Sequence, residues 1–532
     1  MARTPLFRNL ILALQKARSN HLKAQNLPQP ITLSSLNCSR RKFLKNAALM
    51  GAVGLAGSCF PLVGCSSNKS DKPKVAIIGG GIAGLNAAYQ LQKSGVNATV
   101  YEANSRIGGR MLSVPLENQL VVDLGAELIN TDHEDMLSLV EELDITLFNR
   151  VEDSAASTFP ADAFYFGGVA YSEDQLAADL ELIAAQITSD AALLDEDWDT
   201  NAPIFDELSV EDYLTQHADK ITKPYILDLF KNVMRTEFGV ETDESSAIQF
   251  ILVLPVIDGQ SVDLLSYSDE VYSVVGGSSK ITDALGEKLG DNIKLEKTLT
   301  KIKKEESNYL LTFADDSTVT AEYVIVAIPF TVLSGITIDA PIPSLLSSFI
   351  SEAKMGSNEK VIGGFSSRFW KQENGFTNAA WVDGGFSEVW DETSRQSSLT
   401  NGALNFFLGG DQARALSETT DLNSLGTQFV AELDAYLPGA TSAATGKFIK
   451  SSWTNSSLTK GGYANYEPGQ LTQYGSLLWI ESEDAEERQE VVFDKLIFIG
   501  EQLSDAYYGF MNGGAQTGRL AAQYILAEIE AT

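Results

Sequence analysis

One stretch of the chain, Lys74–Arg110, restricts the possible folds more than any other; it reads KVAIIGGGIAGLNAAYQLQKSGVNATVYEANSRIGGR. Its apolar start, Val75–Ile78, has the length of one buried strand. Gly79, Gly81 and Gly84 follow at G-x-G-x-x-G spacing, before a helix-like run and a second strand-like run. The order strand, glycine turn, helix, strand predicts a βαβ unit that binds a dinucleotide.

Each residue of this motif is needed at its position for a physical reason. Gly79 permits the tight turn, Gly81 lets the backbone approach a pyrophosphate, and Gly84 lets the helix pack close to the strand. The unpaired N–H groups at the helix N-terminus favour the pyrophosphate charge. Glu102 ends the second strand, 18 residues after Gly84, where a dinucleotide fold needs an acid. An ordinary βαβ turn without a ligand explains these features less well together.

The motif continues into Ser105–Arg110, S-R-I-G-G-R. Arg106 and Arg110 flank a Gly-Gly turn that includes Gly109, and guanidinium groups match phosphate oxygens. The combination resembles the FAD-binding amine oxidase superfamily, which contains monoamine, polyamine and L-amino-acid oxidases, carotenoid desaturases and protoporphyrinogen oxidases. NAD enzymes do not usually carry this R-x-G-G-R extension. The resemblance implies FAD as the cofactor.

Two later blocks extend the resemblance over nearly all of the chain. Glu322–Pro329, E-Y-V-I-V-A-I-P, resembles the segment that closes the FAD domain, and Leu299 falls where a backbone amide and carbonyl meet the adenine. The strand-like Lys495–Gly500 precedes Glu501, a glycine-rich turn and a helix expected from about Ala515 to Ile529. By the same resemblance, Gly500, Glu501 and Met511 contribute to the flavin site.

The resemblance also places a substrate site. Lys360 precedes Trp370 by ten residues, as does the family lysine that holds a water against flavin N5. Trp453 and Tyr463 lie in W-T-N-S-S-L-T-K-G-G-Y, which lacks the family's proline; Tyr463 would form one wall of an aromatic cage and Phe510 the other. The cage would hold an amine against the ring for hydride transfer to flavin N5. Core packing is the alternative for Phe510, and a surface position for Lys360.

Substrate type and flavin attachment also follow from the resemblance. Leu128 occupies the place of the arginine that binds the substrate carboxylate in amino-acid oxidases, although another arginine, such as Arg235, could replace it. Glu127 and Asn130 fall where polyamine oxidases have polar pocket residues. There is no cysteine near Tyr463, where monoamine oxidases attach the flavin, so non-covalent FAD is expected.

The first 64 residues carry nine Lys or Arg and no acid. Ser39–Lys45, S-R-R-K-F-L-K, matches the twin-arginine export consensus, and Ala47–Val63 is apolar but broken by glycines. Leu62–Cys65 resembles a lipobox, which would leave Cys65 as a lipid-modified N-terminus; a plain signal peptide is the alternative. We expect export by the twin-arginine route and membrane contact through that lipid.

Without this segment, 30 basic residues stand against 71 acidic ones, a net charge of −41. Nucleic acid is therefore not an expected partner, because binding it requires a basic face. An acidic field could steer cationic substrates, or serve solubility alone. With three Cys, all at or before Cys65, and three His, neither a metal centre nor a Ser-His-Asp triad is expected.

We therefore predict an α/β fold with a discontinuous, Rossmann-like FAD-binding domain (72–131, 272–334 and 484–532). The mixed-sheet and helical substrate domain would comprise 132–271 and 335–483, after a signal and tether in 1–71. The predicted reaction is FAD-dependent oxidation of an amine or L-amino acid, with a polyamine or basic amino acid favoured and oxygen or membrane quinone as acceptor. The alternatives are a desaturase or porphyrinogen-type oxidase, and a non-catalytic FAD-fold protein.

Overall fold

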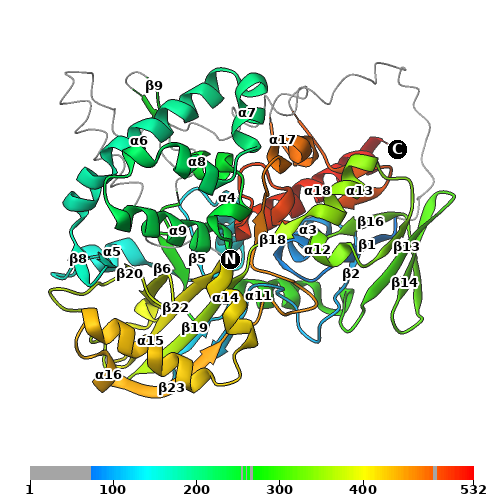
Figure 1. The fold of residues 1–532 in the computed structure, drawn as a ribbon. Coiled ribbons are helices and arrows are strands. Elements are labelled where there is room, and N and C mark those ends of the chain that lie inside the picture. The colour runs from blue at the N-terminus through cyan, green and yellow to red at the C-terminus, as the bar shows by residue number, and fades with distance from the viewer. Residues whose placement is uncertain (1–72, 253–255, 259–260, 264–267, 483–487, 532) are drawn as a thin grey trace.

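The computed structural model describes residues 73–252, 256–258, 261–263, 268–482 and 488–531. The expected signal, Cys65 and tether lie outside these residues. In Figure 1 a nucleotide-binding sheet with its helices lies on the right, and a second sheet with a group of helices above it lies on the left. Within the described ranges, no helix combines the length and apolarity needed to cross a membrane.

The first sheet is built from segments that are far apart in the sequence. Its strands in spatial order are β12 (Ile293–Lys294), β2 (Ala98–Tyr101), β1 (Val75–Ile78), β16 (Tyr323–Val326), β26 (Leu496–Phe498) and β25 (Val492–Phe493). All neighbours are parallel except β25 and β26. Every residue of β1 and β16 is buried, as their continuous apolar runs predict for the middle of a parallel sheet.

Helix α3 (Ile82–Lys93) follows β1 and packs along α18 (Met511–Ala531). A Cβ on Gly518 would lie 2.3 Å from the carbonyl oxygen of Ala83, so only glycine permits this approach. The Asn86 amide donates to the carbonyl oxygen of Ala515 at 2.7 Å. Helix α18 begins four residues before the predicted start at Ala515, because packing against α3 accommodates the glycines that suggested a turn.

A four-stranded sheet and one helix complete this half of the molecule, at the right of Figure 1. The strands, in order, are β15 (Thr318–Ala321), β14 (Asn308–Phe313), β13 (Leu299–Glu305) and β17 (Thr337–Asp339). Helix α11 (Ser279–Leu289) packs against α3 and precedes β12.

The second large sheet has seven strands and is mixed, because β20 and β7 are parallel and the other pairs antiparallel. In spatial order they are β23 (Ala444–Lys450), β19 (Asn358–Phe365), β22 (Gly402–Gly409), β21 (Glu388–Asp391), β20 (Ala379–Val382), β7 (Asp162–Phe166) and β8 (Val169–Tyr171). Helices α14 (Gly410–Glu418) and α15 (Leu422–Tyr436) cover one face.

The two faces of this sheet carry different residues because side chains alternate along a strand. Val361 and Phe406 belong to the apolar cluster shared with α15. Lys360, Phe407 and Glu388 are directly paired across β19, β22 and β21, so they share the opposite face. That face is turned away from α15.

Helices dominate the upper left of Figure 1. They are α6 (Glu173–Glu196), α7 (Trp198–Asp206), α8 (Val210–Gln216), α9 (Pro224–Phe238) and α10 (Ala247–Leu252). Helix α6 starts with a capping box made by Ser172 and Gln175.

Short elements connect these units. They are β3 (Ser113–Pro115), β4 (Val121–Asp123), β5 (Leu128–Ile129), α4 (Glu134–Glu142), β6 (Leu147–Asn149), α5 (Arg150–Ala155), β9 (Val256–Asp258), β10 (Ser261–Asp263), β11 (Tyr272–Val274), α12 (Phe330–Leu333), α13 (Ser344–Glu352), β18 (Lys354–Met355), α16 (Ala440–Ala443), β24 (Ala464–Asn465) and α17 (Gln470–Tyr474).

Candidate active site

A cavity of about 460 Å³ runs along the carboxyl edge of the first sheet. The segments that line it come from the glycine motif, the loop after β2, the start of β13, the loop after β16, residues 453–459 and residues 500–514. Of the residues predicted to bind the cofactor, those on the wall are Gly79, Gly81, Glu102, Arg106, Gly109, Arg110, Leu299, Trp453, Gly500, Glu501 and Met511. Gly84 is not on the wall.

The glycines of the first turn differ in their surroundings. A Cβ on Gly84 would lie 2.1 Å from the carbonyl oxygen of Gly79, so Gly84 serves the packing of helix against strand. Gly79 has φ of 108°, which favours glycine. A Cβ on Gly81 would meet no atom within 4 Å and would enter the cavity. Gly81 is also the N-cap of α3 and gives no side-chain cap, so the N-terminal N–H groups of α3 remain for an anion.

The acid and the arginines of the motif also hold the loop itself. Glu102 accepts hydrogen bonds from the Gly80 amide at 2.6 Å and the Asn104 amide at 2.7 Å. Arg106 donates to the Gly109 carbonyl at 2.7 Å, and burial lowers its pKa. In this structure both guanidinium groups donate to protein oxygens, and both arginines line the cavity, so their contact with phosphates stays a prediction.

Arg110 and Glu501 connect three distant segments at the edge of the cavity. Arg110 Nη1 lies 2.8 Å from Glu501 Oε1 and donates to the Gly462 carbonyl at 2.6 Å. Glu501 Oε2 accepts a hydrogen bond from the Gly509 amide at 2.8 Å. The peptides just before Tyr463 and Phe510 are therefore held by one ion pair.

The two predicted cage residues are buried at this edge. Tyr463 is 1% exposed, its hydroxyl donates to the Thr236 carbonyl, and its ring packs with Trp453. Phe510 is 5% exposed and lines the cavity, and its ring centroid is 5.0 Å from that of His133. Trp453 is fixed by a hydrogen bond from Nε1 to the Leu124 carbonyl at 2.8 Å.

Lys360 is 3% exposed, which excludes the alternative of a surface lysine. Its Nζ lies 2.8 Å from Glu127 Oε2, 2.9 Å from the Asp123 carbonyl oxygen and 3.6 Å from Glu392 Oε2. It also lies 5.1 Å from the centroid of the Trp390 ring. The lysine does not itself line the cavity that the glycine motif forms.

Arg395 completes this ion-pair network. It bonds Asp123 at 2.9 Å and Glu127 at 3.2 Å, and all three side chains are buried. Burial opposes ionisation of Glu127, but the charges of Lys360 and Arg395 lower its pKa to about 2. Burial and the charge of Glu127 raise the pKa of Glu392 well above its usual value. The network therefore keeps Glu127 charged and favours a proton on Glu392.

Three residues with expected roles around the substrate have protein partners in this structure. Glu127 is bound by Lys360, Arg395 and Trp390. Asn130 Oδ1 accepts hydrogen bonds from Ser268 and Glu270. Arg235 forms a bidentate pair with Glu241. Their contact with a substrate stays a prediction.

Sequence reasoning did not find Arg395, Glu392, Trp390 or Glu270. None belongs to a motif, and Arg395 reaches Glu127 across 268 residues of sequence. The signal that could have found Trp390 and Glu392 is their position on β21 and directly after it.

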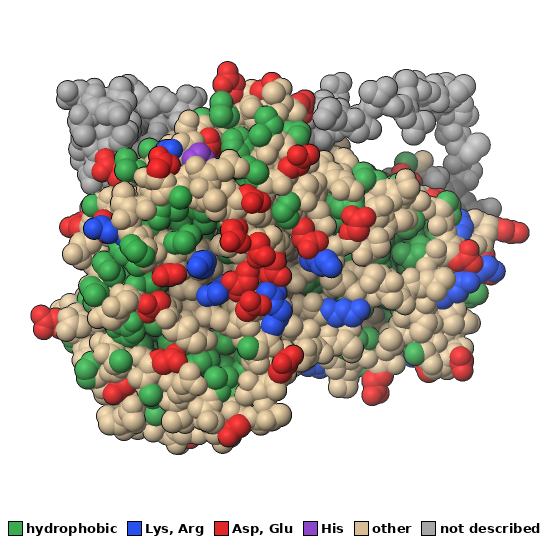
Figure 2. All heavy atoms as spheres, in the orientation of Figure 1, with side chains coloured by type: hydrophobic (Ala, Val, Ile, Leu, Met, Phe, Trp, Pro, Cys, Tyr) green, Lys and Arg blue, Asp and Glu red, His purple; other side chains and the backbone are tan. Residues whose placement is uncertain are grey.

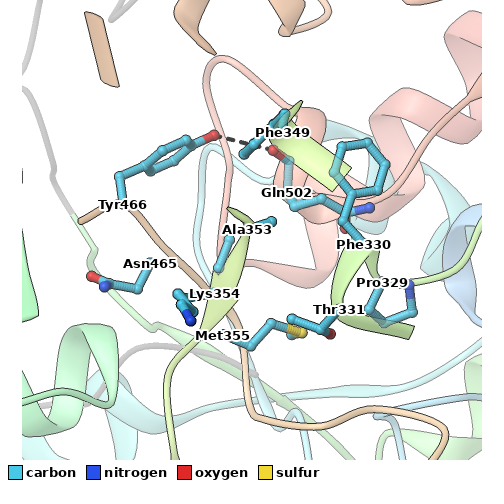
Figure 3. A pocket seen from close by; sticks show the side chains of 11 residues that line it. Pro329, Phe330, Thr331, Phe349, Ala353, Lys354, Met355, Asn465, Tyr466 and Gln502 are labelled. Atoms are coloured by element: carbon cyan, nitrogen blue, oxygen red, sulfur yellow. Dashed lines mark hydrogen bonds between the residues drawn. The ribbon is translucent and has the colours of Figure 1, made fainter. Parts of the chain in front are cut away.

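A second, smaller pocket adjoins the cavity and shares Gln502 and Pro329 with it. Figure 3 shows its lining, mostly apolar side chains such as Phe330 and Phe349, and the bond from the Tyr466 hydroxyl to the Gln502 carbonyl at 3.2 Å. Its walls offer no cluster of ionisable groups, so the chemistry belongs to the larger cavity.

Comparison with known proteins agrees with this geometry. Residues 82–526 match the family model described as flavin containing amine oxidoreductase. The chain belongs to this family. It is an FAD-dependent enzyme of the amine oxidoreductase type, and the long cavity with its glycine turn and helix N-terminus fits that cofactor.

Individual relatives of this amine oxidoreductase cover nearly the same length. Flavin-containing amine oxidase B of Homo sapiens is 28% identical over 479 residues, which is 86% of each chain. Flavin-containing amine oxidase A of Sus scrofa is 26% identical over 477 residues, 87% of this chain and 86% of that protein.

Solved structures show the same fold. Cyclohexylamine oxidase from Brevibacterium oxydans IH-35A matches with a TM-score of 0.71 at 24% identity, over 86% of this chain and 100% of that chain. Wild-type putrescine oxidase bound to putrescine matches with a TM-score of 0.69 at 23% identity, over 86% and 99%.

Proposed function

We propose that this amine oxidoreductase removes two electrons from the C–N bond of a small, positively charged amine, and that the imine then hydrolyses to a carbonyl compound and ammonia or a smaller amine. The observation that carries the proposal is the Arg110–Glu501 pair, which holds the segments of Tyr463 and Phe510 at the edge of the cavity. A polyamine or a basic amino acid is the favoured substrate class.

FAD would lie along the cavity, with its pyrophosphate at Gly81 and the N-terminus of α3 and its adenine near Leu299. When bound, it supplies a two-electron acceptor for the carbon next to nitrogen. We propose non-covalent binding, since Gly462 precedes Tyr463 and Cys65 is the last cysteine of the sequence. Acid denaturation should then release all of the flavin.

The protein's own groups orient the amine. The faces of Tyr463 and Phe510 would grip the nitrogen and exclude water around it. Lys360 supplies a fixed positive charge beside Glu127, on the face of the second sheet that is turned away from α15. There it could order a water, as the resemblance implies. A neutral amine is the reactive form, so the substrate must lose a proton before oxidation.

Charge supports a cationic substrate. The chain has 71 acidic against 39 basic residues. Acidic side chains are spread over the face shown in Figure 2, most densely near its centre. Such a surface attracts cations and repels anions over about one Debye length, roughly 8 Å at physiological ionic strength.

We propose oxygen as the electron acceptor, with hydrogen peroxide as the product. Membrane quinone is the acceptor that a lipid-anchored, exported enzyme would favour instead. Export and the lipid at Cys65 remain predictions from the sequence, because those residues lie outside the described ranges.

The test is product analysis with purified enzyme and a panel of monoamines, diamines, polyamines and amino acids. We expect peroxide and carbonyl product in equal amounts from cationic amines. The Tyr463→Ala variant should lose about tenfold or more in kcat/KM, and Tyr463→Phe, which keeps the ring, should lose much less. No carbonyl product from any amine, with oxygen or with a quinone, would contradict the proposal.

A further inference from the structure

Glu270 is a buried acid whose side chain has no hydrogen-bond partner among the described residues. It is 2% exposed, and neither carboxylate oxygen has a partner within the described part of the chain. Leaving such a group unsatisfied costs free energy, so a buried polar atom of this kind usually indicates water or a ligand. The φ of Glu270 is 45°, a left-handed conformation that is uncommon for residues other than glycine.

The backbone around Glu270 is fixed beside the predicted amine cage. The Glu270 amide donates to Asn130 Oδ1 at 3.1 Å. The Asn130 amide in turn donates to His133 Nδ1 at 3.1 Å, and the His133 ring packs at 5.0 Å against Phe510. One short chain of contacts therefore links Glu270 to one wall of the cage.

Other acids surround the same space. Burial raises the pKa of Glu270 well above its usual value; the charge of Arg150 opposes this, and the charges of Glu237 and Glu388 add to it. Glu237 directly follows Thr236, whose carbonyl accepts the hydroxyl of Tyr463. Tyr463, the other wall of the predicted cage, is therefore also bonded to a segment that carries an acid.

The face of the second sheet that is turned away from α15 carries further polar side chains. Glu388 shares that face with Lys360, two strands away or about 10 Å. Asn405, paired with Trp390 on the same face, is fully buried, and neither atom of its amide has a partner among the described residues. The same holds for Nε1 of Trp381, opposite Glu388.

These unsatisfied polar atoms lie just before β11, on β20 and on β22. Clustered atoms of this kind indicate a polar chamber that holds water or a ligand, because dry cavities are lined by apolar groups.

We propose that Glu270 binds the second, unreacted ammonium group of a diamine or polyamine and thereby sets the substrate class. The proposal rests on the proposed function, since it assumes that the first amino group lies in the cage. A carboxylate in a buried site pairs strongly with an ammonium group, as in other charge-assisted hydrogen bonds.

The cations near the chamber argue against an amino acid. Lys360 and Arg395 are bound to Glu127, Glu392 and Asp123. Arg150 donates to the Glu270 carbonyl at 3.2 Å and to Asn378. Each of these cations already has protein acceptors, whereas the side chain of Glu270 has no hydrogen-bond partner in the described part of the chain, so the chamber selects a cation and not an α-carboxylate.

The test compares amines of equal carbon length, butane-1,4-diamine and n-butylamine, on wild type, Glu270→Gln and Glu373→Gln. Glu373 is an exposed acid, and its variant controls for the loss of one negative charge. In Glu270→Gln we expect KM for the diamine to rise about 10- to 100-fold, with kcat changed less and n-butylamine kinetics nearly unchanged. Glu373→Gln should match wild type for both amines.

Binding gives a second readout that does not depend on turnover. Without oxygen, the diamine should raise the Tm of wild type more than n-butylamine does, and Glu270→Gln should lose that difference. If Glu270→Gln changed KM equally for both amines, or left KM for the diamine unchanged, the role of Glu270 would be overturned. The proposed function would still stand. A wild type that oxidises neither these amines nor any other would overturn the proposed function, and the Tm difference would still test Glu270.

Discussion

Arg110 Nη1 lies 2.8 Å from Glu501 Oε1, although 391 residues separate the two in sequence. Through the Gly462 carbonyl and the Gly509 amide, this ion pair fixes the peptides that carry Tyr463 and Phe510. The glycine-motif loop, the residues after the second sheet and the C-terminal segment therefore share one anchor. Both side chains line the cavity predicted to hold the cofactor, so we expect cofactor binding and cage geometry to change together when either is replaced.

Replacing Glu501 tests this anchor. In Glu501→Ala, Arg110 loses its buried partner, and breaking a buried pair costs about 3 kcal/mol or more. We expect the Tm to fall and the affinity of apoprotein for FAD, measured by quenching of flavin fluorescence, to fall at least about tenfold. Glu501→Gln keeps an acceptor for Arg110 and should lose less. An Ala variant with wild-type affinity for FAD would show that the pair is not an anchor.

Lys360 and Glu127 provide a second test. Lys360→Met leaves Glu127 and Glu392 without the cation 2.8 and 3.6 Å away, which should cost about 3–5 kcal/mol of stability. The rate of flavin reduction by amine should fall about tenfold or more. In the double variant Lys360→Met/Glu127→Gln the acid is also neutral, so part of the stability should return. Strictly additive losses in denaturant titrations would count against the pair.

Substitutions at two glycines of the motif should have different effects, one on flavin content and the other on folding. The side chain of a Gly81→Val variant would enter the cavity, where no protein atom lies within 4 Å of a Cβ. This variant should fold and yet purify without flavin. In Gly84→Val the new Cβ would lie 2.1 Å from the Gly79 carbonyl oxygen, so the fold itself should suffer. Circular dichroism and flavin content distinguish the two, and a yellow Gly81→Val protein would be evidence against the predicted pyrophosphate position.

Glu270 should also make stability depend on pH. Burial raises its pKa in the folded protein, so between the unfolded and folded pKa values the folded chain holds the extra proton. The contribution of this group to stability is therefore lost as pH rises through that window. Because Gln cannot ionise, Glu270→Gln should raise the Tm more at about pH 8 than at about pH 5, by roughly 1–2 °C. A larger gain at the lower pH would contradict the assignment of a raised pKa.

Local patterns in the sequence predicted those parts of the structure that depend on neighbouring residues. The run Val75–Ile78 with its glycines specified β1, the turn and the start of α3. Lys360, which lies on β19, was found from its spacing to Trp370. Patterns of this kind are short-range, and the physical rules for them are strong.

Long-range partners could not be predicted in the same way. Glu127 pairs with Lys360 across 233 residues, and only the folded sheet brings them together. Met511–Gly514 was interpreted as a turn because of its glycines, whereas those glycines allow α18 to approach α3. Glu270 belongs to no sequence pattern, because its proposed role rests on the absence of a hydrogen-bond partner among the described residues.

The most direct measurement is anaerobic mixing of the purified protein with butane-1,4-diamine while the visible absorption band of the flavin is followed. We predict a yellow protein whose band bleaches on mixing and returns when oxygen is admitted. A protein that stays colourless after reconstitution with FAD, or one whose flavin is bleached by dithionite but by no amine, would contradict the account.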